Sequence, residues 1–225
     1  MNKLARHSGK MVAIVAALTV LSVSALAEIV YDNTAPQNYL GQDIARLTEF
    51  GDQITLSTAT ASRLLSNFRF DYYLAPAASG NESLTFKLYA NDGPNGTPQT
   101  DLTAGKTWSV SLASGFNNVN FGFDQTGPFK VSLPETFTWS VLFAGIEGQE
   151  QAGLLMFNPP TVGTSFNDFW ERQPDGSWNT MQVLAAPANF SAQVTAVPEL
   201  GTLQYGLMGG LAWIGFAIRR RLAAR

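Results

Sequence analysis

The side chains that could perform chemistry in this sequence are almost all carboxylates. The chain of 225 residues contains 17 Asp and Glu residues, but only one histidine, His7, and no cysteine. His7 lies in a predicted signal peptide, so the mature chain would have neither residue type. Ser-His-Asp hydrolysis, Cys-His catalysis and ordinary zinc or copper sites are therefore excluded.

Two pairs of carboxylates are candidates for a glycoside hydrolase, because that reaction needs two acids and no histidine. Glu147 and Glu150 lie in the segment IEGQEQAG, and Asp168 and Glu171 flank Phe169-Trp170. With so many acids scattered along the chain, close pairs arise by chance. Solvated acids in loops or at strand edges are the favoured interpretation.

Calcium is the second chemical possibility, since it binds oxygen ligands. The segment NDGPNGTPQTD offers Asp92, Asn95 and Asp101. It lacks the acid spacing and the final Glu of an EF-hand loop, and Gly-Pro and Asn-Gly are common turn dipeptides. A β-hairpin loop is favoured, and we predict no bound metal and no cofactor.

Three aromatic residues are candidates for stacking on sugar rings. Trp170 and Trp178 lie in DFWERQPDGSWNT, which has the pattern of a β-hairpin, and Tyr73 lies in an alternating segment. The alternative is that the two tryptophans pack across the hairpin or into the core, and this packing is favoured.

The N-terminus has the features of a secretory signal peptide over residues 1–27. Basic residues precede an apolar run from Met11 to Val23, and Ala25-Leu26-Ala27 matches a small-x-small cleavage site. We expect signal peptidase to cleave after Ala27, so that the mature chain begins at Glu28. The Sec translocon and signal peptidase are the implied partners.

The C-terminus has the features of a single transmembrane helix. Residues 200–218 carry no charge and would span about 28 Å as a helix, close to the thickness of a bilayer core. Arg219, Arg220 and Arg221 follow directly, and such a cluster stays on the cytoplasmic side. Both basic ends of the precursor would therefore lie on the cytoplasmic side of a membrane, with the middle of the chain exported.

The middle of the chain is acidic. Of the 14 basic residues, three precede the first apolar run and four follow the last, which leaves seven against 16 acids and a net charge of about −9 between Glu28 and Pro198. Because nucleic acid needs a basic surface, we expect no nucleic-acid partner.

Residues 28–196 alternate between apolar and polar side chains, as strands with one solvated face do. Phe68, Phe70, Tyr72 and Leu74 form one such row, and Phe137, Trp139, Val141 and Phe143 form another. Turn-rich segments such as Ser114–Asn118 and Gln173–Trp178 separate the rows. The pattern predicts an all-β fold, an antiparallel β-sandwich of jelly-roll type.

The C-terminal segment 197–225 resembles the PEP-CTERM sorting signal. Val197-Pro198-Glu199, a glycine-rich apolar span and Arg219-Arg220-Arg221 occur in the order of that family, although Leu200 stands where the family has a second proline. The resemblance implies an exported protein of a Gram-negative bacterium. An exosortase would remove its tail and release it to the cell surface or the exopolysaccharide matrix. The ectodomain also resembles β-sandwiches that precede such tails.

The expected role is therefore that of a surface or matrix protein with a non-catalytic, adhesive or structural β-sandwich. A carbohydrate-binding module for extracellular polysaccharide is the first alternative. A carboxylate-based glycan hydrolase is the second.

Overall fold

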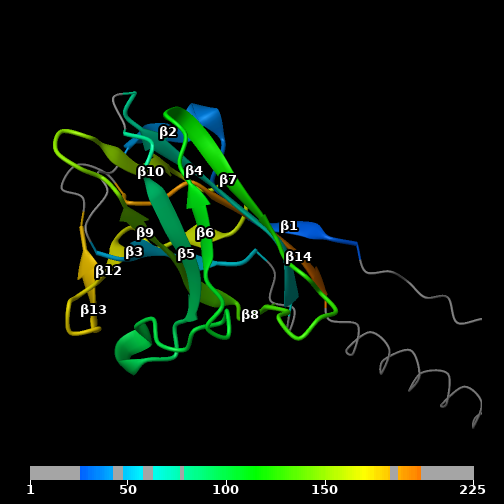
Figure 1. Cartoon of the computed structure of the whole chain (residues 1–225). Coiled ribbons are helices and arrows are strands. Elements are labelled where there is room, and N and C mark those ends of the chain that lie inside the picture. Colours follow the sequence, from blue (N-terminus) through cyan, green and yellow to red (C-terminus); the bar gives the residue numbers. More distant parts are fainter. Residues whose placement is uncertain (1–25, 43–47, 58–62, 77–78, 183–186, 199–225) are drawn as a thin grey trace, which may run out of the picture.

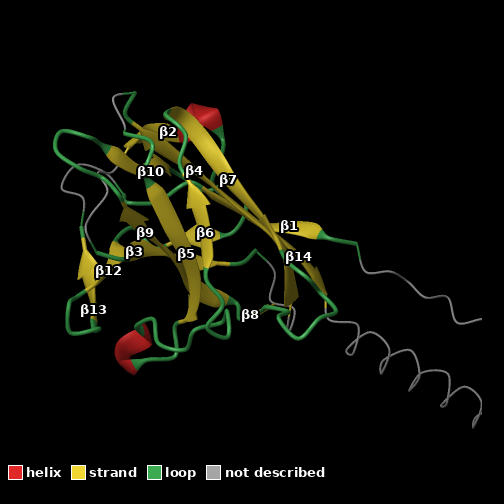
Figure 2. Cartoon of the chain, in the orientation of Figure 1, coloured by secondary structure: helices red, strands yellow, loops and turns green. Residues whose placement is uncertain are grey.

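A computed structural model of the chain describes residues 26–42, 48–57, 63–76, 79–182 and 187–198. These residues form an all-β domain built from two antiparallel sheets, with helical structure limited to two short 3-10 turns at Pro36–Asn38 and Pro94–Gly96 (Figures 1 and 2). Within these ranges no helix has the length and apolar character needed to cross a membrane. Most of the predicted signal peptide, the predicted span 200–218 and the arginine cluster lie outside the described residues.

The first sheet, called here the β4 sheet, is built around its longest strand. Along the path the strands follow the order β1-β14-β4-β10-β2, and β7 and β8 also pair with β4. The strands β14 and β7 pair with overlapping parts of β4, so they lie on its opposite edges. The bounds are β1 (Glu28–Asp32), β2 (Tyr39–Gln42), β4 (Arg63–Leu74), β7 (Gly115–Gly122), β8 (Ser132–Leu133), β10 (Ala152–Phe157) and β14 (Ala192–Pro198).

The second sheet, called the β9 sheet, contains the remaining strands in the order β13-β12-β3-β9-β5-β6, and β11 also pairs with β3. The chain passes between the sheets several times, because β3, β5 and β9 belong to this sheet while β4, β8 and β10 belong to the other. The bounds are β3 (Phe50–Thr55), β5 (Ser83–Ala90), β6 (Trp108–Ser111), β9 (Thr136–Ala144), β11 (Thr164–Ser165), β12 (Phe169–Arg172) and β13 (Trp178–Met181).

One hydrophobic core joins the two sheets. The predicted apolar rows of β4 and β9 are confirmed, since their side chains are all buried. Aromatic rings from opposite sheets meet directly: the centroid of Phe68 lies 4.8 Å from Phe86 and that of Phe70 lies 5.4 Å from Trp139. Buried aromatic side chains contribute the largest apolar areas of any residue type, so this contact layer is expected to dominate the stability.

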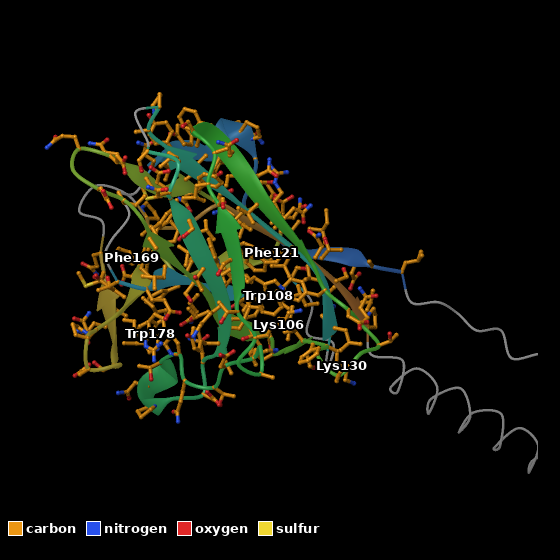
Figure 3. All side chains as sticks on the ribbon, in the orientation of Figure 1. Lys106, Trp108, Phe121, Lys130, Phe169 and Trp178 are labelled. Atoms are coloured by element: carbon orange, nitrogen blue, oxygen red, sulfur yellow. The ribbon has the colours of Figure 1, made fainter. Side chains whose placement is uncertain are left out.

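Trp108 closes the side of the domain where β6 and β7 face each other. Its ring centroid lies 6.4 Å from Phe121 and 5.0 Å from Phe123. The ammonium of the exposed Lys106 lies 5.0 Å from the same centroid, and Figure 3 labels Lys106, Trp108 and Phe121 in one region of the domain. The indole thus packs against the core with one part and against a cation with another, which is an arrangement that aromatic rings favour. Lys106 covers an aromatic side chain that is only partly buried.

Two expectations from the sequence pattern were wrong. Thr138 and Ser140 alternate with the core row of β9 and were expected to face solvent, but both are fully buried. Asn91 donates a hydrogen bond to the hydroxyl of Thr138, and Glu49 accepts one from the hydroxyl of Ser140. Loop side chains therefore cover this face of the sheet. Ser114–Asn118 is not a turn throughout, since β7 begins at Gly115 and pairs with β4 along its whole length.

Candidate functional site

The predicted ends of the mature domain lie side by side. Glu28 is the first residue of β1 and pairs with Ala196 of β14, while Pro198 is the last residue of β14 and pairs with Arg63 of β4 (Figure 1). Of the predicted cleavage site, Ala27 is exposed and directly precedes β1, and Ala25 lies outside the described residues. The first and last strands therefore bring the two predicted processing sites to one end of the β4 sheet.

Arg63 connects these two ends. Its guanidinium Nη1 donates to Glu28 Oε1 at 2.7 Å, and its side chain is 3% exposed against 51% for that of Glu28. A buried guanidinium requires a charged or hydrogen-bonded partner, so the contact holds the start of β1 against β4. Val197 and Pro198 are half-buried in the adjoining strand, and Glu199, residues 200–218 and Arg219–Arg221 are outside the described part of the chain.

Trp170 is not available to a sugar. Its side chain is buried, its Nε1 donates to Gln53 Oε1 at 3.2 Å, and its ring stacks on Phe166 with centroids 5.9 Å apart. The predicted hairpin is confirmed, since β12 and β13 pair in antiparallel register. Trp170 faces the β3 strand across this hairpin, which is the packing that the sequence favoured.

Trp178 is half-buried and packs against neighbours on the β9 sheet. Its ring meets Tyr89 edge-on at a centroid distance of 5.3 Å, and the guanidinium carbon of Arg172 lies 5.9 Å from its centroid. Arg172 is in turn 3.1 Å from Glu49. Figure 3 shows Trp178 and Phe169 on the same side of the domain, distant from Trp108. Its contacts give Trp178 a structural role, and only part of its ring faces solvent.

Tyr73 is half-buried, and its ring belongs to an aromatic pair whose other member is exposed. It lies on the outer side of β4 opposite Phe116 of β7, with ring centroids 4.9 Å apart. Phe116 is 65% exposed, which is unusual for a side chain of its size. Phe116 was not among the predicted site residues because its segment, Ser114–Asn118, has the composition of a turn. The alternation of Phe116, Asn118 and Asn120 with Val119 and Phe121 is the signal that could have identified it.

The three calcium candidates belong to a loop, and the carboxylates of the two acids among them are hydrogen-bonded to other groups of that loop. Both carboxylate oxygens of Asp92 accept hydrogen bonds from Thr100, one from the backbone N–H at 3.0 Å and one from the hydroxyl at 2.6 Å. Asp101 accepts from the backbone N–H and hydroxyl of Thr103, and Asn95 has a left-handed backbone conformation with φ 56°. Among the residues that the structure describes, no three His, Cys, Asp or Glu side chains form a group that could hold a metal ion.

The predicted acid pairs also have structural partners. Glu150 accepts from the backbone N–H groups of Ser79 at 2.8 Å and of Glu147 at 2.9 Å. Glu171 accepts from the hydroxyl of Thr48 at 2.5 Å, and Asp168 accepts from Gln182 at 3.4 Å. These contacts are those of acids that order loops and strand edges.

One acid that the sequence analysis did not identify lies beside Glu150. Glu82 is buried, and its carboxylate accepts from the N–H groups of Ser79 at 2.5 Å and Gly80 at 2.8 Å. Desolvation raises the pKa of Glu82, but the hydrogen bonds outweigh it and leave the pKa lowered. A general acid of a glycosidase needs a raised pKa, so Glu82 is poorly suited to that role.

A second unidentified acid lies inside the domain. Asp52 is fully buried, and its Oδ2 accepts from the hydroxyl of Ser165 at 2.7 Å and from the N–H of Phe190 at 3.1 Å. Burial raises the pKa of Asp52 well above its usual range, and burial together with the Asp52 charge raises the pKa of Tyr31. Because Asp52 is closed off from solvent, no substrate could reach it in this conformation.

No family model and no curated protein matches the chain.

Proposed function

We propose that this chain is an exported surface or matrix protein whose β-sandwich, of jelly-roll type, has an adhesive or structural and non-catalytic role. The proposal takes the precursor to be delivered by the Sec translocon and held at the inner membrane. Signal peptidase then cleaves before Glu28, and an exosortase processes the chain near Pro198–Leu200. The product reaches the surface or exopolysaccharide matrix of a Gram-negative bacterium.

The observation that supports this proposal best is the position of the two predicted processing sites. Glu28 and Pro198 begin and end adjacent, paired strands, and Arg63 contacts or pairs with both. A domain attached to the membrane through both ends needs those ends on one side. The remaining surface is then free to face away from the membrane.

The acids support a non-catalytic role. A glycan hydrolase would need one carboxyl with a raised pKa that can reach substrate beside a second, ionised carboxyl. Asp52 has the raised pKa but is buried, and Glu82 has a lowered pKa. Neither of these two acids therefore suits the general-acid role of a hydrolase.

The proposed role of Pro198-Glu199 in exosortase recognition can be tested against a second Pro-Glu dipeptide in the same chain. We expect the double variant Pro198→Ala, Glu199→Ala to stay in the membrane fraction of the native host, because the exosortase would no longer recognise it. The matched control is Pro134→Ala, Glu135→Ala, which alters the other Pro-Glu dipeptide before β9 and leaves the backbone bond from Leu56 to the Glu135 carbonyl in place. This control should reach the medium or cell surface like the unaltered protein. Secretion of the first variant at an unchanged level would contradict the proposal.

Carbohydrate binding is a second candidate function, and the pairing of the half-buried Tyr73 with the exposed Phe116 favours it. Sugar rings stack on aromatic side chains because C–H groups with a small positive charge meet the negative face of the ring. A matrix protein that binds polysaccharide would hold the matrix together directly.

A further inference from the structure

The outward side chains of β4 and β7 form a continuous surface, called here the β4–β7 face. In the antiparallel register Tyr73 lies opposite Phe116, Asp71 opposite Asn118 and Arg69 opposite Asn120. Directly opposed residues project to the same side of a sheet, and alternate residues of a strand lie about 7 Å apart. Three successive cross-strand pairs therefore form a strip with an aromatic end and a polar end.

The aromatic end of this face is a rigid apolar platform. The rings of Tyr73 and Phe116 are tilted by 48° at a centroid distance of 4.9 Å, and each strand fixes the position of its ring. Phe116 is 65% exposed, so most of its ring lies in solvent. Large exposed aromatic side chains beside polar groups are typical of binding surfaces.

The polar end consists of one fixed ion pair and two exposed amides. Asp71 is buried and accepts from Arg69 Nη2 at 3.0 Å and from the hydroxyl of Ser191 at 2.5 Å, so its carboxylate is fixed and holds the partly exposed guanidinium of Arg69 in place. Asn118 and Asn120 are exposed, and each amide offers both donors and an acceptor. Such groups suit sugar hydroxyls, which also donate and accept.

The charge of the surface selects among polysaccharides. Arg69 is the single cation on this face, and it is paired with Asp71. A second acid, Asp32, lies nearby in the same sheet. Its carboxylate accepts a hydrogen bond from Gln193, which is the cross-strand neighbour of Arg69. The domain as a whole carries about nine excess negative charges. A uronate or phosphate polymer would be repelled, whereas an uncharged one would not.

We propose that the β4–β7 face binds a neutral polysaccharide built from pyranose rings. One ring stacks on Tyr73 and Phe116, and the next along the polymer hydrogen-bonds to the exposed amides of Asn118 and Asn120 and to the partly exposed guanidinium of Arg69. This inference rests on the second candidate function and not on the sorting of the precursor.

Affinity gel electrophoresis of the exported protein, produced from the full-length gene, tests the proposal. The gels contain neutral polymers (hydroxyethyl cellulose, galactomannan, soluble starch) or uronate polymers (alginate, polygalacturonate). We expect at least one neutral polymer to retard the protein and neither uronate to do so. Phe116→Ala should weaken that retardation by about tenfold, the effect of losing one stacked ring and its buried area.

Phe129→Ala is the matched control, because Phe129 is also an exposed phenylalanine, 56% accessible, but lies outside β4 and β7 and contacts Lys106 instead. It should bind like the unaltered protein. Asn118→Ala is a second variant on the face in case Phe116→Ala alters folding, and it should bind more weakly. The proposal is overturned if no neutral polymer binds, if only uronates bind, or if both face variants bind unchanged. Because the assay uses purified protein, it is independent of whether the tail is removed.

Discussion

Replacing Gly51 by alanine is expected to destabilise the domain by more than about 4 kcal/mol, enough to unfold a protein of ordinary stability. Gly51 lies in β3 opposite Ser140 of β9. A Cβ atom at this position would lie 1.8 Å from the carbonyl oxygen of Trp139 and 2.6 Å from the Cα of Ser140. Both are backbone atoms of the adjacent strand, so β3 and β9 would have to separate in the middle of the sheet.

Urea unfolding followed by tryptophan fluorescence measures this effect. Gly122→Ala is the control, because Gly122 is an exposed strand glycine of β7 with no atom within 4 Å of an added Cβ. Its stability should change by less than about 1 kcal/mol, or rise slightly, since glycine is a poor strand residue. Unfolding of Gly51→Ala at the same urea concentration as the unaltered protein would show that the two strands are not packed as described.

Replacing Asp52 by asparagine is expected to stabilise the domain at neutral and alkaline pH. The folded state holds the Asp52 carboxyl with a raised pKa, so it retains a proton that the unfolded chain releases near pH 4. The free energy of unfolding of the unaltered protein should therefore fall as pH rises above about 4, by up to about 1.4 kcal/mol per pH unit, until the folded carboxyl ionises. Asparagine cannot ionise, and its side-chain oxygen can still accept the hydrogen bonds from the hydroxyl of Ser165 and the N–H of Phe190.

The free energy of unfolding of Asp52→Asn should be close to that of the unaltered protein near pH 4 and should exceed it by more than about 1 kcal/mol at pH 7 to 8. Thermal or urea unfolding across this pH range measures the difference. Asp175→Asn is the control, because its effect on stability should depend on pH in the opposite direction. Hydrogen bonds from Ser177 lower the pKa of Asp175, so its contribution to stability is present above the unfolded pKa and lost as pH falls. If Asp52→Asn is less stable than the unaltered protein at pH 8, Asp52 is ionised in the folded state and our account of it is wrong.

The alternation of apolar residues was sufficient to predict the class of fold and the inner faces of the main strands. Phe68, Phe70 and Tyr72 are buried as a row because successive side chains of a strand point to opposite sides, whatever the rest of the chain does. Alternation does not tell whether the other face is solvated. Thr138 and Ser140 were expected to face water, and they are covered by loop residues from distant parts of the chain.

The candidate site was predicted only in part for the same reason. Tyr73 was identified from its chemistry, but its partner Phe116 is 43 positions away and is brought to it by the pairing of β4 with β7, which a single sequence does not reveal. Trp170 was identified from equally suitable chemistry, and its contacts with Gln53 and Phe166 bury it. Residue type indicates which side chains could bind a sugar, and tertiary contacts decide which of them are accessible.

The two ends of the domain connect the fold to the proposed function. Because β1 and β14 are paired, the chain enters and leaves the β4 sheet at the same end, where Arg63 contacts Glu28 and pairs with Pro198. Cleavage at these two positions would leave the whole β-structure from Glu28 to Pro198 intact. The β4–β7 face would then be released with the domain.

Mass spectrometry of the protein recovered from the medium or cell surface of the native host is the most direct test of this account. We predict a chain that begins at Glu28 and ends between Pro198 and Leu200. An extracellular protein that still ends at Arg225 would contradict the proposed processing and would indicate that the C-terminal segment is retained.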